Sequence, residues 1–93
     1  MSDLVHLKAV VHGKVQGVYY RAFVSHAAKA LSIKGFVRNT RSGEVELEAE
    51  GDRINIDELL RQLYIGPPEA MVKKIDTTWS AFQGLYKSFE VRY

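Results

Sequence analysis

The sequence predicts an α+β fold of the split β-α-β type, in which two helices cover one face of an antiparallel sheet. Three observations support this prediction. Several segments alternate apolar and polar residues, which is the period of a half-buried strand. Two other segments carry apolar residues at helical spacing. Along the chain these segments follow the order strand, helix, strand, strand, helix and strand, and one further strand closes the sequence.

The first strand is expected over residues 4–12 and ends at Gly13. Its apolar side chains share one parity and would face the core: Val5, Leu7, Ala9 and Val11. A helix is expected over about 21–31, with Gly35 shortly beyond its end. Its apolar residues recur at helical spacing, so one side of the helix would pack on the sheet: Phe23, Ala27, Ala30 and Leu31.

A hairpin is expected next. The stretch GFVRN at 35–39 predicts a short strand, and TRSG at 40–43 turns the chain. In the following EVELEAE, three apolar residues would point inward, whereas four glutamates, Glu44, Glu46, Glu48 and Glu50, would form a solvated face. We interpret these glutamates as surface residues and not as a calcium site.

The second helix is expected to begin at a capping residue, either Asp52 or Asn55, the latter with Glu58 three residues on. Gly66, followed by two prolines, would stop it. Its apolar stripe consists of Ile56, Leu59, Leu60 and Leu63.

Two strands complete the chain, over about 71–79 and 87–93. The second alternates cleanly, whereas KKIDTTW at 73–79 does not and predicts a bulge. The aromatic residues of this region are expected in the core or its lid: Trp79, Phe82, Phe89 and Tyr93. The complete order is that of a ferredoxin-like fold, so residues 1–93 are expected to form a single domain.

Composition excludes several functional classes. The net charge is only +2, so attraction to polyanions would need local clustering, and no nucleic-acid partner is expected. The chain has no cysteine, which removes thiolate nucleophiles and sulfur-ligated metals. The N-terminus lacks the continuous apolar core of a signal peptide, and no run is long enough for a membrane span. We therefore expect a cytoplasmic protein without a membrane partner, and a monomer.

The stretch HGKVQGVYYR, residues 12–21, lies where the first strand passes into the first helix. Unpaired amides and the helix dipole at such a junction favour an anion. Gly13 would release the chain into a turn, Gly17 would let the backbone approach a ligand, and Arg21 would hold phosphate oxygens. Glycine spacing alone is equally compatible with an ordinary turn and a solvated arginine. Neither nucleotide-binding fingerprint is present.

These residues also carry a resemblance. The run VHGKVQGVYYR at 11–21 resembles the first signature of the acylphosphatase family, and GFVRN at 35–39, with Gly43, Val45 and Gly51, resembles the second. The resemblance covers the whole chain. One position departs from the pattern, because Tyr20 stands where the family usually has phenylalanine.

The resemblance implies a ferredoxin-like fold and hydrolysis of carboxyl phosphates to a carboxylate and inorganic phosphate. The partner would be a small-molecule acyl phosphate. By position, Arg21 would bind the phosphate and Asn39 would hold the attacking water. The backbone amides of the loop would form the phosphate cradle, from Gln16, Gly17, Val18, Tyr19, Tyr20 and Arg21.

No metal or cofactor is expected. A carboxylate leaves without protonation, so oriented donors such as Arg21 and the loop amides are sufficient for an activated substrate. The remaining polar residues are interpreted as surface groups: His6 and His12 on a strand, His26 on a helix, and Arg38 and Arg41 beside Asn39.

The alternative is a non-catalytic module of the same fold, for RNA or protein binding. Residues 34–37, KGFV, resemble the beginning of an RNA-binding consensus. However, Arg38 and Thr40 stand where further stacking aromatics would be needed, and the stretch lies on the second strand and not the third.

Overall fold

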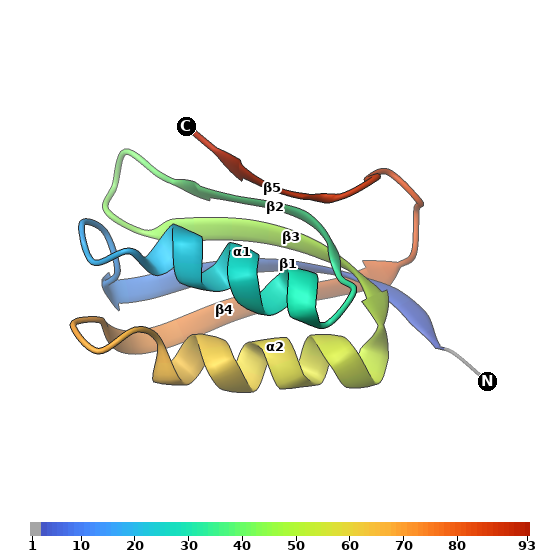
Figure 1. Ribbon diagram of the computed structural model, residues 1–93, viewed down its shortest axis with the longest axis horizontal. Coiled ribbons are helices and arrows are strands. Elements are labelled where there is room, and N and C mark those ends of the chain that lie inside the picture. The colour runs from blue at the N-terminus through green and yellow to red at the C-terminus, as the bar shows by residue number, and fades with distance from the viewer. Residues whose placement is uncertain (1–2) are drawn as a thin grey trace.

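Two helices lie side by side on one face of a five-stranded sheet (Figure 1). The structure, a computed structural model, describes residues 3–93. The elements are β1 (Leu4–Lys14), α1 (Tyr20–Ala30), β2 (Lys34–Asn39), β3 (Val45–Asp52), α2 (Arg53–Ile65), β4 (Met71–Ala81) and β5 (Phe89–Arg92). The predicted α+β split β-α-β arrangement is confirmed. Within residues 3–93, no helix is long and apolar enough to cross a membrane.

The sheet has the strand order β4-β1-β3-β2-β5. Four of the strands pair antiparallel, as predicted, but β5 runs parallel to β2, so the sheet is mixed and the prediction of a wholly antiparallel sheet is wrong at this edge. The cause lies in the connection. After β4 the chain crosses the full width of the sheet at one end, and it can then return only in the direction of β2 (Figure 1).

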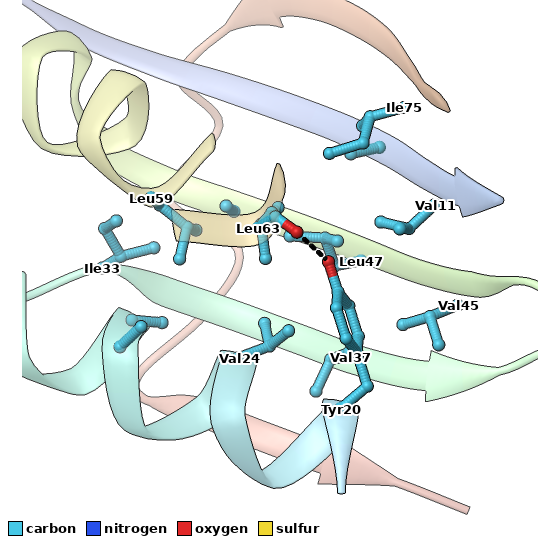
Figure 2. Close-up of a cluster of buried hydrophobic side chains, with 14 of the residues drawn as sticks. Val11, Tyr20, Val24, Ile33, Val37, Val45, Leu47, Leu59, Leu63 and Ile75 are labelled. Carbon is cyan, nitrogen blue, oxygen red and sulfur yellow. Dashed lines mark hydrogen bonds between the residues drawn. The ribbon is translucent and has the colours of Figure 1, made fainter. Parts of the chain in front are cut away.

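The core lies between the helices and the sheet. The residues of predicted inward parity on β1 and β3 are buried or partly buried there (Figure 2). The predicted apolar residues of both helices are buried or partly buried as well, except Ala30, which is exposed at the last position of α1. Phe89 is buried and Trp79 packs against the core, whereas Phe82 and Tyr93 are exposed and lie outside it. Burial of this apolar surface is the main source of stability, at roughly 25 cal/mol per Å².

The predicted bulge lies at the start of KKIDTTW. His12 pairs with Lys74 but Gly13 pairs with Val72, so Lys73 is the extra residue on β4. Pairing resumes beyond the bulge, and β1 therefore continues past its predicted end at Gly13. An added Cβ at Gly13 would collide with the backbone carbonyl of Met71. The glycine thus permits close approach of β4 and does not start a turn.

The start of α2 has one of the two predicted residues at its cap, but without the predicted side-chain bond. Asp52 occupies the N-cap position, but its side chain makes no capping bond, and Asn55 lies inside the helix. Instead, the amide of Arg53 donates to the carbonyl of Asp3 at 2.9 Å. A backbone group from the N-terminal segment thus replaces the side-chain cap. The helix ends before Gly66, as predicted.

His6 and Glu50 are buried on the helix-free face of the sheet, although both were expected at the surface. The relative solvent exposure is 4% for His6 and 2% for Glu50. His6 lies between two carboxylates, with Nδ1 2.8 Å from Glu50 Oε2 and Nε2 2.9 Å from Glu48 Oε1. His26 is exposed, as expected, and His12 is partly exposed and contacts Asp76 at 2.9 Å.

The segment that connects β4 to β5 is the cause of this burial. The amides of Gln83 and Leu85 donate to the Glu50 carboxylate at 2.8 and 3.1 Å, and the Tyr86 hydroxyl donates to Glu48 at 2.9 Å. Burial alone would raise the pKa of Glu50, but the hydrogen bonds from His6 and from the two amides outweigh it and hold this pKa below its usual range. Glu50 therefore anchors the crossover segment as a carboxylate.

Replacing Glu50 by glutamine should destabilise the fold in a pH-dependent way. Because the folded-state pKa is lowered, the stabilisation is fully present above the ordinary value of 4.5 and is lost as pH falls through the folded-state value. We expect Glu50→Gln to lose about 1–3 kcal/mol of unfolding free energy at pH 7 and much less at pH 3. Urea unfolding followed by fluorescence of the single tryptophan measures this.

The matched control is Glu69→Gln, since Glu69 is exposed. Its unfolding free energy should follow that of the wild type at both pH values. Equal losses for Glu50→Gln at pH 7 and pH 3 would show that the ionised carboxylate does not stabilise the crossover.

Candidate active site

The loop between β1 and α1 lies at the end of the sheet where β2 ends and β3 begins (Figure 1). A pocket of about 430 Å³ opens there, between this loop, the first turn of α1, the end of β2 and the last residues of the chain. Five of the seven predicted site residues line it, namely Gly17, Tyr19, Tyr20, Arg21 and Asn39. The structure thus brings the two predicted signatures together.

The loop backbone has unpaired donors. The first helical hydrogen bond of α1 runs from the Phe23 amide to the Tyr19 carbonyl, so the amides of residues 20–22 have no helical acceptor. Among the hydrogen bonds of residues 3–93 outside helices and strands, none has an amide of residues 16–19 as its donor. Gly17 and Tyr19 both have positive φ, at 73° and 61°. Such a backbone, at the positive end of a helix dipole, favours an anion.

Arg21 projects from the first turn of α1 into the same pocket. Its guanidinium lies 4.7 Å from the centre of the Tyr93 ring, and its Nη1 donates weakly to the carbonyl of Arg92 at 3.4 Å. Among the ion pairs of residues 3–93, none includes Arg21. Its charge is therefore compensated by no carboxylate in the described structure and can be used on an anionic ligand.

Asn39 is the last residue of β2 and presents an unused acceptor. Its Oδ1 is buried and has no hydrogen-bond partner among the described residues. A buried polar atom without a partner typically costs about 1–3 kcal/mol. Asn39 is a lining residue of the pocket, and its side-chain oxygen has unused capacity to accept a hydrogen bond.

Gln16 and Val18 do not line the pocket. The Gln16 carboxamide donates from Nε2 to the carbonyls of Thr40 and Glu44, each at 2.8 Å, which ties the loop to the turn between β2 and β3. Val18 is buried in the core. The side chains of both residues therefore position the loop, and only their amides remain as candidate phosphate donors.

Tyr20 connects the start of α1 to the end of α2. Its hydroxyl donates to the carbonyl of Leu63 at 2.7 Å (Figure 2). In a continuing helix that carbonyl would accept from the residue four positions on, but this is Pro67, which has no amide hydrogen. The tyrosine supplies the missing donor, and burial raises the pKa of its hydroxyl. The departure from phenylalanine is thus accommodated by a specific bond.

Sequence reasoning missed part of the pocket wall. Val91 and Tyr93 line it from β5 and the residue beyond. No local pattern signals that position, because it follows from the parallel pairing of β5 with β2. Arg38 pairs with Glu46 at 2.7 Å and is exposed, as is Arg41, in line with their interpretation as surface groups. Within residues 3–93, no group of three or more histidine, aspartate or glutamate side chains is arranged so that it could hold a metal ion.

Substituting Tyr20 by phenylalanine should lower stability and leave the pocket intact. The variant leaves the buried Leu63 carbonyl without a donor, so we expect a loss of about 1–3 kcal/mol in unfolding free energy. Chemical denaturation measures it. Tyr64→Phe, at an exposed position of α2, is the matched control and should unfold like the wild type. Equal stability of Tyr20→Phe and Tyr64→Phe would contradict the assigned role.

Comparison with known proteins identifies a family and several relatives that the chain resembles. The model of the acylphosphatase family matches residues 7–91. An acylphosphatase of Dehalococcoides mccartyi is 46% identical over 88 residues, which cover 94% of this chain and 97% of the relative. The crystal structure of acylphosphatase from Bacillus subtilis has a TM-score of 0.93 at 30% identity and covers 96% of this chain and 99% of that one. For an acylphosphatase from Coxiella burnetii the TM-score is 0.91 at 37% identity, with coverages of 97% and 94%.

Proposed function

The chain belongs to the acylphosphatase family and is an acylphosphatase, a hydrolase, and we propose how its residues perform the reaction. The amides of residues 16–21 and the Arg21 guanidinium hold the phosphoryl group of a small acyl phosphate. The Asn39 carboxamide orients the attacking water. No metal ion takes part.

One observation carries the proposal: a single pocket is lined by Arg21, by loop residues with free amides and by Asn39. Among the described residues, Arg21 has no carboxylate partner, the loop amides have no acceptors and the buried Asn39 Oδ1 has no donor. The first two are donors suited to phosphate oxygens, and the third is an acceptor suited to water. A phosphoryl group seated on the donors would therefore lie beside a water held by Asn39. This combination supports phosphoryl transfer to water.

The chemistry needs few groups. The bond between phosphorus and the acyl oxygen breaks, and the carboxylate leaves with the electron pair and needs no proton. The water oxygen forms the new bond to phosphorus, and its proton passes to a phosphate oxygen. Because the transition state is loose, with charge on the equatorial oxygens, oriented donors provide most of the catalysis. Asn39 is neutral, so it contributes by positioning the water and not by acting as a strong base.

The magnitudes are sufficient for an activated substrate. By analogy with other enzymes, one preorganised amide donor contributes on the order of 10²- to 10³-fold. An arginine on a transferring phosphoryl group contributes on the order of 10³- to 10⁵-fold. Arg21 and two or three loop amides therefore account for a large acceleration without a Lewis acid.

The same proposal includes a monomer that acts in the cytoplasm and does not bind nucleic acid. The small net charge supports the last of these, the absence of nucleic-acid binding, and so does the state of Phe36, the aromatic residue of the RNA-binding-like stretch. Its ring is only 6% exposed, and the Arg92 guanidinium covers it at 4.1 Å from the ring centre. A base cannot stack on a ring that is already covered, so the RNA-binding alternative is not favoured.

The proposal is tested by assaying the purified protein on acetyl phosphate and benzoyl phosphate in the presence of EDTA. We expect turnover that EDTA does not reduce, and poor cleavage of a phosphate monoester such as p-nitrophenyl phosphate, whose leaving group is less activated. Release of inorganic phosphate is the measurement. Loss of activity with EDTA that Mg²⁺ restores would refute the metal-independent mechanism.

Variants at Arg21 and Asn39 separate their two roles. We expect Arg21→Ala to raise KM and to lower kcat/KM by on the order of 10³-fold, because phosphate binding and charge stabilisation are both lost. Asn39→Ala should lower kcat on the order of 10²-fold with little change in KM, because only the water loses its acceptor.

Arg41→Ala is the matched control, since Arg41 is an exposed arginine two residues beyond Asn39. Its kinetic constants should stay near those of the wild type. Near-normal rates for Arg21→Ala or Asn39→Ala, with the fold retained, would remove the corresponding role.

A further inference from the structure

A second pocket lies at the same end of the sheet as the candidate active site. Its volume is about 560 Å³, and its lining comes from the end of β1, the turn between β2 and β3 and the start of β4. These three segments lie at one end of the sheet (Figure 1). The two pockets share no lining residue, and the chain passes from one to the other between Lys14 and Val15. The proposed reaction makes no use of the second pocket.

The second pocket carries two lysines that the fold leaves without a carboxylate. Lys14 and Lys73 both line it, and both are exposed. Within residues 3–93, the lysines that form ion pairs are Lys8 and Lys74 instead. Two ammonium groups at one pocket, each with three donors, attract an anion.

Lys73 reaches this pocket through a departure from regular strand pairing. It is the extra residue of the β4 bulge, opposite the step from His12 to Gly13. Bulges redirect side chains and are common beside functional sites. This bulge requires glycine on the partner strand, because an added Cβ at Gly13 would collide with the Met71 carbonyl oxygen and the Lys73 amide nitrogen. Both strands therefore depart from the regular ladder where the lining lysines lie.

The carboxylates near the second pocket already have partners. Glu44, the acidic residue of the lining, accepts from Thr40 Oγ1 at 2.6 Å through Oε1, and its Oε2 lies 3.9 Å from His12 Nδ1. Asp76, outside the lining, lies 2.9 Å from His12 Nε2 and 3.9 Å from Lys74 Nζ. These contacts direct the negative charge away from Lys14 and Lys73, which remain available to a ligand.

Ser42 adds neutral donors to the two cations. In its turn the amides of Thr40 and Gly43 have backbone acceptors, whereas the Ser42 amide has none among the described residues. The exposed Ser42 hydroxyl lines the pocket as well. Two ammonium groups, a hydroxyl and a free amide suit the several oxygens of a tetrahedral dianion better than the two oxygens of a carboxylate.

We propose that the second pocket binds a phosphate dianion through Lys14, Lys73 and the amide and hydroxyl of Ser42. The ligand is inorganic phosphate or the phosphoryl group of a small organic molecule whose body contacts Met71, which is 69% exposed in the lining. Because both lysines are exposed, binding is weak and decreases as salt rises. The site shares no residue with the active site, so the proposal does not depend on the proposed function.

The test is a titration of ¹⁵N-labelled protein with inorganic phosphate at constant ionic strength and about pH 8, where phosphate is mainly a dianion. We expect two groups of amide signals to move, each with its own apparent Kd. One group comes from the active-site loop, 17–21, and the other from Ser42, Gly43 and Lys73. In Arg21→Ala the response of the loop should weaken and that of the second group should persist.

Variants assign the second group to the proposed ligands. We expect Lys14→Gln and Lys73→Gln each to raise its Kd about 3- to 10-fold, because each removes one of the two positive charges. Lys74→Gln is the matched control, since Lys74 is the exposed neighbour of Lys73 and lies outside the lining. Its Kd should equal that of the wild type. A parallel titration with phenyl phosphate identifies the source of the dianion: tighter binding than that of inorganic phosphate assigns an organic phosphate, and weaker binding assigns the free ion.

Two results would overturn the inference. In the wild type, signals of Ser42, Gly43 and Lys73 that stay in place at saturation of the active site would show that the second pocket binds no phosphate. An equal rise in Kd for Lys74→Gln and Lys73→Gln would show diffuse attraction to positive charge and no defined site. Neither result would affect the hydrolase assignment, which is tested by turnover.

Discussion

Two hydrogen bonds from the Gln16 carboxamide, to the carbonyls of Thr40 and Glu44, hold the active-site loop against the turn between β2 and β3. Thr40 follows Asn39 directly, so the same contact fixes the end of β2 that carries the residue proposed to bind water. Because a side chain makes this tertiary link, the main-chain amides of the loop are not consumed by it. β3 separates β1 from β2 in the sheet, and the long Gln16 side chain spans that distance.

Along the loop, some side chains hold it in place, whereas others line the pocket. The side chains of Gln16, Val18 and Tyr20 anchor it, through a pair of hydrogen bonds, core burial and the bond to Leu63. The alternate residues, Gly17, Tyr19 and Arg21, line the pocket. Left-handed backbone and amides without acceptors are unfavourable locally, so they persist only where neighbouring anchors determine the conformation. A loop held in this way presents its donors before substrate arrives, which is the condition for electrostatic stabilisation of a transition state.

Contacts at the opposite end of the sheet also affect this pocket, because they set the position of β5. The buried carboxylate of Glu50 holds the crossover segment, and the crossover sets the position of β5 beside β2. Tyr93, which lies directly after β5, then lines the pocket and contacts Arg21. Stability at one end of the molecule and the shape of the site at the other are therefore connected through a single strand.

Alternation and helical spacing determined the order of the elements, the core face of β1 and β3 and the fold class. The reason is that the spacing of apolar residues within each strand or helix indicates which of its sides is buried. The paired motifs in turn predicted that Arg21 and Asn39 would lie together, and both line one pocket. Only the tertiary structure decided that β5 is parallel, that Glu50 is buried, that Tyr20 replaces the donor absent from Pro67, and that Tyr93 lies beside Arg21. Each of these depends on a segment distant in the chain, and local periodicity carries no information about which distant segment will cover a residue.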